Sequence, residues 1–252
     1  MQKYFDELKT ACLMYKWLLL KMIFWGIIVM YLGWNFILKR PIYQKLYGIP
    51  SNEKLQIWNQ DSFIEIPEQR IIPLQINGYD IEVQAIKSFK TVARIVYIDK
   101  YGTLGTWARS FDEARLYDKI VPQDISIATG AVGRDPSCIK FTHEYRVLSA
   151  NRTNKPCSPE FLQNYVNEIS NNHSIAASFN VQKGLDILKP GDVAAIEGYA
   201  IYWNGTGRLS HVRFESAITL GQISPQIIGG QHGILCRQLL ITKITFDGYT
   251  FE

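Results

Sequence analysis

Residues 80–86 (DIEVQAI) and 91–99 (TVARIVYID) decide the fold class of this chain. Both stretches are rich in β-branched residues and alternate apolar with polar positions, which is typical of half-buried strands. Similar runs recur at residues 124–128 (DISIA), 193–203 (VAAIEGYAIYW) and 233–246 (GILCRQLLITKITF). We therefore expect a mainly β (α+β) domain, predominantly antiparallel and folded as a barrel or sandwich, with short helices.

Further local patterns fill in this domain. Residues 138–148 predict another strand, and residues 160–169 (EFLQNYVNEI) carry apolar positions at the spacing of a helix. The polar residues 170–172 (SNN) then predict the end of that helix. Residues 189–192 (KPGD) predict a turn, and Gly198 predicts a bulge or bend in a long strand.

The N-terminal part contains one long apolar run. Residues 17–38 (WLLLKMIFWGIIVMYLGWNFIL) hold a single charge, at Lys21. As a helix this run is roughly 33 Å long, enough to cross the hydrocarbon core of a membrane. A buried core helix is rarely apolar on every side over this length. We expect a transmembrane helix at residues 17–38 that stays attached, since no cleavage site of small residues follows it.

The flanking residues set the expected organisation. Residues 1–16 place apolar side chains at helical spacing, so they predict either an amphipathic juxtamembrane segment or an extension of the spanning helix. Residues 39–75 contain four prolines and little periodicity, which predicts a connector before a globular domain at residues 76–252. A small excess of lysines before the helix favours a cytoplasmic N-terminus and an extracytoplasmic domain.

Composition argues against two kinds of partner. The net charge is +4 and its charges are dispersed, so nucleic acid is not expected. The cysteines and histidines lack the spacing of a zinc site, so neither a metal nor another cofactor is expected. The histidines are interpreted as structural; they are His143, His173, His211 and His232.

Cys138 and Cys157 are expected to form a disulfide. The globular part has three cysteines, and Cys236 stands among apolar strand residues, where a small buried hydrophobe is its ordinary role. The other two lie beside loop residues, and joining them closes a loop worth about 3 kcal/mol in the chain-entropy estimate. The bond would fit an oxidising compartment; the alternative is two unpaired thiols in a cytoplasmic domain.

Several motifs resemble an uncharacterised bacterial family of single-pass, membrane-anchored proteins with a β-rich domain. The resemblance covers about residues 79–245, and its most specific part is residues 170–173 (SNNH) followed by residues 189–193 (KPGDV). Family members carry SNNH-x-I-P-A and then a GD-V-x-L-x-G strand, and here Ala176 replaces the proline. The resemblance implies a β-rich domain anchored in a bacterial inner (plasma) membrane, and it implies no activity.

We expect a cell-envelope protein that serves as a non-catalytic binding or assembly module of a membrane complex, with a protein partner or a second copy of itself. No nucleophile, base and orienting group stand at a recognisable spacing. Candidate contact residues are Asn171, Asn172 and His173, interpreted as a polar loop, and Tyr202 and Trp203, which are either core residues or aromatics exposed at a hairpin end.

The alternative is a sortase-like cysteine transpeptidase or protease. Sortases also combine a membrane helix with a β-barrel, and His173, Gly191-Asp192 and Cys236 follow here in the sortase order. A reactive thiolate needs a base or a cation nearby. The sortase T-L-x-T-C motif is absent, and Arg237 is adjacent to Cys236 and therefore faces the other side of the strand. We expect Cys236 to be buried and without a catalytic role.

Overall fold

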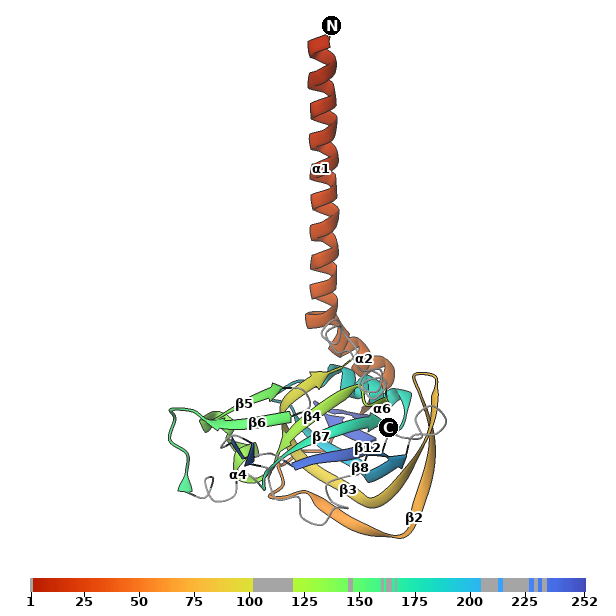
Figure 1. Cartoon of the computed structure of the whole chain (residues 1–252), viewed down its shortest axis with the longest axis vertical. Coiled ribbons are helices and arrows are strands. Elements are labelled where there is room, and N and C mark those ends of the chain that lie inside the picture. The colour runs from red at the N-terminus through yellow and green to blue at the C-terminus, as the bar shows by residue number, and fades with distance from the viewer. Residues whose placement is uncertain are drawn as a thin grey trace. The chain divides into compact units, whose positions relative to one another are not determined.

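The computed structural model describes residues 2–101, 120–144, 147–159, 161, 165, 167–204, 213–214, 227–228, 231–232 and 235–252. The chain forms two compact units, Met1–Leu46 and Tyr47–Glu252. The first unit is helical, and the second holds the strands (Figure 1).

The helical unit consists of one long helix and its continuation. Helix α1 (Gln2–Leu32) is followed directly by a π-helical segment (Gly33–Leu38) and by helix α2 (Lys39–Tyr47). Residues 2–16 run without a break into the apolar run, and both belong to α1. In the described part of the chain, no helix alone has the length and hydropathy of a membrane span. Two segments meet these criteria only when they are taken together, Leu19–Asn35 and Lys39–Tyr47, and the angle between them is 48°.

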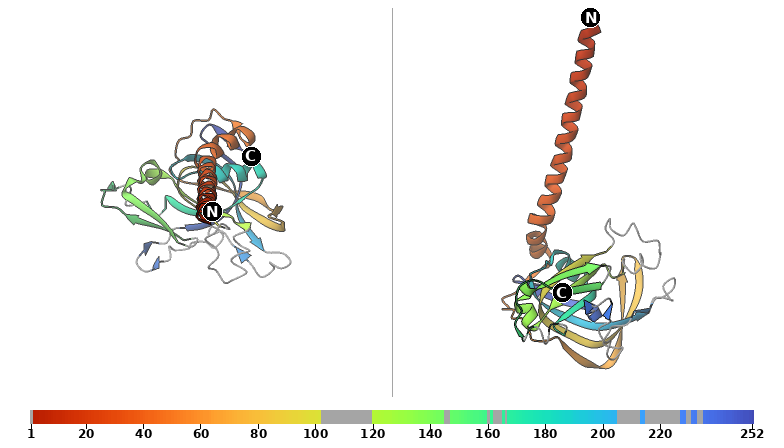
Figure 2. Two further views of the ribbon diagram at one scale, coloured as in Figure 1. Left: turned by 90° about the horizontal axis from the view of Figure 1, so that it is seen from above. Right: turned by 60° about the vertical axis from the view of Figure 1, so that its left-hand side comes forward.

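The β-rich unit begins earlier than the sequence predicts. Strand β2 (Ser62–Ile76) pairs antiparallel with β3 (Tyr79–Lys100), and the two lie side by side in Figures 1 and 2. The connector expected at residues 39–75 is therefore wrong at both ends, because residues 39–47 are helical and residues 62–76 belong to the sheet.

The prolines of β2 explain this error. Pro67 falls in the register shift between Glu65 and Arg70, and Pro73 stands opposite Glu82. Among the described residues β2 pairs with β3 alone, so it is an edge strand there. Edge strands and bulges tolerate proline, which has no N–H to donate.

Five strands of this unit form a closed path, which we call the strand ring. They are β3, β4 (Gln123–Ala128), β7 (Ile169–Ala176), β8 (Val193–Asn204) and β12 (Leu235–Phe246). Strand β4 pairs with β3 and β7, β7 pairs with β12, and β8 pairs with both β12 and β3. All these pairs are antiparallel except β7 with β12, which is parallel.

The remaining described elements are short. The strands are β1 (Ile49–Pro50), β5 (Ile139–Glu144), β6 (Val147–Arg152), β9 (Arg213–Phe214), β10 (Ile227–Ile228), β11 (Gln231–His232) and β13 (Tyr249–Phe251). The helices are α4 (Gly130–Arg134), a 3₁₀ turn (Pro136–Cys138) and α6 (Phe179–Ile187). Helix α6 was not predicted, although Ser178 caps it by accepting a hydrogen bond from the Val181 N–H.

Several predicted elements occur in altered form. Residues 80–86 and 91–99 belong to one strand, β3, and the strand predicted at residues 138–148 is the antiparallel pair β5 and β6. The turn at residues 189–192 is confirmed, with Gly191 at φ 98°. Much of the helix predicted at residues 160–169 lies outside the described residues, and Ile169 starts β7 instead.

Candidate functional site

Strand β7 carries a polar run through the interior of the β-rich unit. Residues 170–174 (SNNHS) are each at most 8 % exposed and pair with β4 on one side and β12 on the other. The polar loop expected here is therefore wrong. Buried polar side chains are costly unless they are hydrogen-bonded, so their partners show how the site is held.

The first polar row crosses three strands. In the sheet register, His173 of β7 lies opposite Asp124 of β4 and opposite Gln238 of β12. The His173 Nδ1 atom is 2.7 Å from Asp124 Oδ1. The other carboxyl oxygen, Asp124 Oδ2, accepts a hydrogen bond of 2.9 Å from the Tyr101 hydroxyl. Asp124 is fully buried, and Tyr101 and His173 are each 8 % exposed.

These contacts determine the orientation of the imidazole. Nδ1 of His173 is the ring nitrogen directed at the Asp124 carboxyl, and which group donates in this hydrogen bond depends on the imidazole tautomer. In the tautomer with the proton on Nδ1, His173 donates to Asp124 and the lone pair of the neutral ring is on Nε2. An aspartate that fixes the tautomer of a histidine and stabilises its protonated form is the orienting part of a general-base unit.

The second polar row lies beside the first on the same face of the sheet. Ser126 of β4 lies opposite Asn171, and its hydroxyl donates a hydrogen bond of 3.0 Å to Asn171 Oδ1. On the other side of β7, the residue opposite Asn171 is Cys236. Cys236 therefore occupies the position diagonal to His173 on the neighbouring strand.

Apolar clusters enclose the two polar rows at both ends. Ile169 and Ala128, beyond the second row, belong to one buried cluster together with Val132 and Leu148. Ile175, beyond the first row, belongs to another cluster together with Leu240 of β12. The polar groups of this face are thus confined to a short stretch of three strands, in surroundings of low polarity.

The opposite face of the same strands holds a buried ion pair. Arg237 forms an ion pair with Asp61, and its Nη1 donates a hydrogen bond of 3.1 Å to Ser170 Oγ. The guanidinium also stacks over the Phe63 ring at 5.0 Å. Asn172, which lies opposite Arg237, donates to the Ile125 carbonyl oxygen at 3.0 Å. Arg237 therefore ties β12 to the start of β2, and its place in the register is on the other face from His173.

The other predicted contact residues lie elsewhere. Tyr202 is half-buried in β8, and Trp203 pairs with Val83 of β3 and Phe214 of β9. The register thus does not bring them beside His173. His143 lies in β5 and His232 in β11, while His211 is outside the described residues. The described part of the chain contains no cluster of three or more His, Cys, Asp or Glu residues able to hold a metal ion.

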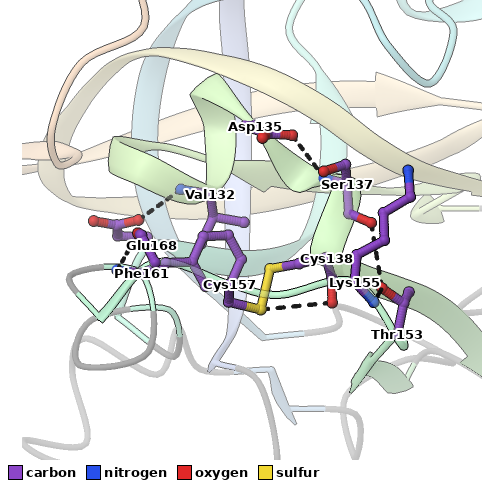
Figure 3. Close-up of a disulfide and its surroundings, with 10 residues drawn as sticks. Val132, Asp135, Ser137, Cys138, Thr153, Lys155, Cys157, Phe161 and Glu168 are labelled. Carbon is purple, nitrogen blue, oxygen red and sulfur yellow. Dashed lines mark hydrogen bonds between the residues drawn. A yellow bond between two sulfur atoms is a disulfide. The ribbon is translucent and has the colours of Figure 1, made fainter.

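The structure contains the predicted disulfide between Cys138 and Cys157, whose Cα atoms are 5.5 Å apart (Figure 3). It joins the residues before β5 to the segment after β6, and both cysteines pack against the cluster that includes Ile169. Nearby, the backbone N–H of Ser137 donates a hydrogen bond of 3.0 Å to Asp135 and lowers the pKa of that carboxyl. The disulfide thus closes a loop within the connection between β4 and β7, the two strands that carry Asp124 and His173.

The sequence alone did not identify Asp124 or Tyr101 as site residues. Asp124 was expected only as the first residue of an alternating strand, and Tyr101 follows the other strand-like run. The available signal was a charged residue inside an otherwise uncharged strand, residues 124–128 (DISIA). Only the pairing of β4 with β7 shows that this charge lies opposite His173.

Comparison with known proteins adds no relative: no family model matches the sequence, and no curated protein or solved structure matches the chain.

Proposed function

We propose that this is a membrane-anchored protein of the bacterial cell envelope whose β-rich unit binds a protein partner in a membrane complex. The observation that carries the proposal is the surface of α1. Successive turns of this helix expose large apolar side chains, among them Leu19, Leu20, Met22, Ile23, Phe24, Trp25, Ile27, Val29 and Met30.

These side chains surround the helix. Consecutive positions of an α-helix are 100° apart, so residues 22–25 alone cover all sides of the axis. Water-soluble proteins rarely expose an apolar surface of this extent without a partner. A lipid bilayer is the partner that covers a helix on every side, and Lys21 near one end can reach the headgroups.

The strand ring supports a binding role for the second unit. Numbered 1 to 5 along the chain, its strands β3, β4, β7, β8 and β12 are paired in the order 1-2-3-5-4 and back to 1. Strands 3 and 5 are parallel, and helix α6 connects strands 3 and 4. We infer that this connectivity is that of an OB-fold barrel, the barrel rather than the sandwich of the two predicted alternatives.

The chemistry of the ring favours a protein partner over nucleic acid. OB-fold barrels bind single-stranded nucleic acid on their second and third strands, through stacked aromatic side chains and a basic groove. Here these strands are β4 (QDISIA) and β7 (ISNNHSIA), which contain neither an aromatic residue of the Phe, Tyr or Trp type nor a lysine or arginine. Fold alone does not decide function. The composition of β4 and β7, together with the membrane anchor, favours a protein partner.

Two measurements on the full chain test the proposal. We expect the protein to remain in the membrane pellet after alkaline carbonate extraction, and to migrate after mild detergent extraction as a complex of defined stoichiometry in native electrophoresis. The matched control replaces residues 17–38 with an unrelated membrane span. This variant stays attached to the membrane, so partner binding by the β-rich unit is measured separately from membrane attachment. Release by carbonate contradicts the anchor; migration at the mass of a single chain in detergent contradicts the complex.

A further inference from the structure

Phe179 is an exposed aromatic residue on a firmly packed helix of the β-rich unit. It is the first residue of α6, and 63 % of its surface is exposed. The helix buries four other positions: Val181, Gly184, Leu185 and Ile187. A Cβ atom at Gly184 would be 2.7 Å from the Phe251 ring, so α6 packs closely on β13. A large apolar side chain is therefore presented outward from a helix whose own position is fixed.

Two neighbours within the same unit hold the Phe179 ring. The Tyr47 ring meets it edge to face, with the two centroids 5.5 Å apart. The Lys183 Nζ atom is 4.7 Å from the centroid of the Phe179 ring, and it is also 3.7 Å from Asp186 Oδ2. Aromatic rings accompanied by a lysine are typical of protein surfaces at the membrane–water boundary, where the rings lie at headgroup level.

The length of α2 keeps this aromatic pair near the apolar run of residues 17–38. Helix α2 begins at Lys39, directly after that run, and ends at Tyr47. Eight helical steps of 1.5 Å separate these two residues by about 12 Å. The headgroup layer on each side of a bilayer is roughly 5–8 Å deep. With the apolar run in a bilayer, Tyr47 thus lies in or just above the headgroup layer, and the Phe179 ring contacts Tyr47.

The charge of the connecting residues indicates which kind of surface is met here. Residues 39–47 (KRPIYQKLY) contain three basic residues, Lys39, Arg40 and Lys45, and no acidic residue. A basic segment directly beside a membrane helix is attracted to anionic lipid headgroups. Within α6 the charges of Lys183 and Asp186 balance, so its contribution to such a contact is the exposed ring. A membrane surface complements both features.

We propose that Phe179, together with Tyr47 and Lys183, docks the β-rich unit on the headgroup layer of the membrane that holds the anchor. The partner of this surface is a lipid bilayer that contains anionic lipid. The inference rests on the membrane anchor of the proposed function and adds a second membrane contact, made by the β-rich unit itself. Two contacts with one membrane restrict the rotation of the unit, so a protein partner meets a defined face of it.

A photoreactive side chain at residue 179 tests this contact in the full chain. The variant Phe179→p-benzoylphenylalanine keeps an aromatic ring at an exposed position, so the fold is preserved. On irradiation this side chain bonds covalently to C–H groups that touch it. The protein is reconstituted in vesicles of phosphatidylethanolamine and phosphatidylglycerol, and mass spectrometry identifies the product. We expect a phospholipid adduct on the peptide that contains residue 179.

The matched control places the same photoreactive group at Ile64, which is 64 % exposed. Ile64 lies near the start of β2, whereas Pro73, toward the other end of this strand, lines a pocket together with Phe179. Burial of a phenyl ring in an apolar layer supports a preference of about tenfold, so the adduct should be about ten times more abundant at residue 179 than at residue 64. Equal yields at the two positions, no lipid adduct at residue 179, or a covalent dimer of the chain in its place would overturn the proposal.

Carbonate extraction of samples that have not been irradiated separates this proposal from the anchor. A protein that stays in the membrane pellet but forms no lipid adduct at residue 179 retains the anchor and rejects the docking surface alone. A lipid adduct at residue 179 of a protein that carbonate releases rejects the anchor and leaves Phe179 as a peripheral membrane contact.

Discussion

Gly198 shows how the strand ring depends on a missing side chain. It lies opposite Phe89 of β3 and Ile241 of β12, so two backbones approach it from both sides. A Cβ atom at this position would be 2.0 Å from the Leu240 carbonyl oxygen. The register of β12 shifts directly after this contact, between Ile241 and Lys243. The predicted irregularity is therefore present, but in the strand opposite the glycine.

The substitution Gly198→Ala should lower the free energy of unfolding by about 3 kcal/mol or more, because the clash is with backbone atoms that cannot rotate away. Gly78→Ala is the comparison: it has open space around its Cβ but a φ of 81°, which costs an alanine roughly 1–2 kcal/mol. Chemical denaturation in detergent measures both. An equal or smaller loss at Gly198 than at Gly78 would show that the ring relaxes around the added methyl group.

The polar residues of β7 mark the limit of sequence-based prediction. The run of residues 170–173 (SNNH) has the composition of a loop, and its neighbours alone give no reason to bury it. The run can be buried because its side chains are hydrogen-bonded: Asn171 accepts from the Ser126 hydroxyl, and Asn172 donates to the Ile125 carbonyl oxygen. Both partners are 45 or more residues away in the sequence. Alternating apolar runs such as residues 91–99 were predicted correctly because their periodicity is a local property.

Elements inserted into the ring were harder to predict than the ring strands. The pair β5 and β6 was predicted as one strand because no strong turn residue separates them in residues 138–148. The disulfide at the base of this pair could be predicted by elimination, since only two cysteines lacked another role. Its position between β4 and β7 could not, because it depends on which strands pair.

Removing the disulfide tests its contribution at this scale. The double variant Cys138→Ser/Cys157→Ser should lose about 3 kcal/mol of unfolding free energy in the chain-entropy estimate, because the unfolded chain regains the freedom of a loop closed over 19 positions. Urea denaturation of the detergent-solubilised chain gives the value, with Cys12→Ser as the matched control. Equal stability of the double variant and the control under non-reducing conditions would refute this contribution.

For the whole molecule, the expected orientation gives a separate prediction. The small excess of basic residues on the N-terminal side, which counts Lys21 near the start of the apolar run, and the disulfide in the β-rich unit both favour an extracytoplasmic location for residues 47–252. Alkaline phosphatase fused after Glu252 should be active in intact cells, and green fluorescent protein at the same place should be dark after export through the general secretion route. Fluorescence together with an inactive phosphatase would reverse the orientation.

The pairing of β12 also has a consequence for the time course of folding. This strand joins β7 in parallel and β8 antiparallel, and it follows both of them in the sequence. During synthesis both β7 and β8 lack this neighbour until β12 has been made. The early chain therefore holds its buried polar strand β7 without half of its hydrogen-bonding partners, and closure of the ring is a late event with long-range contacts, of the kind that folds slowly.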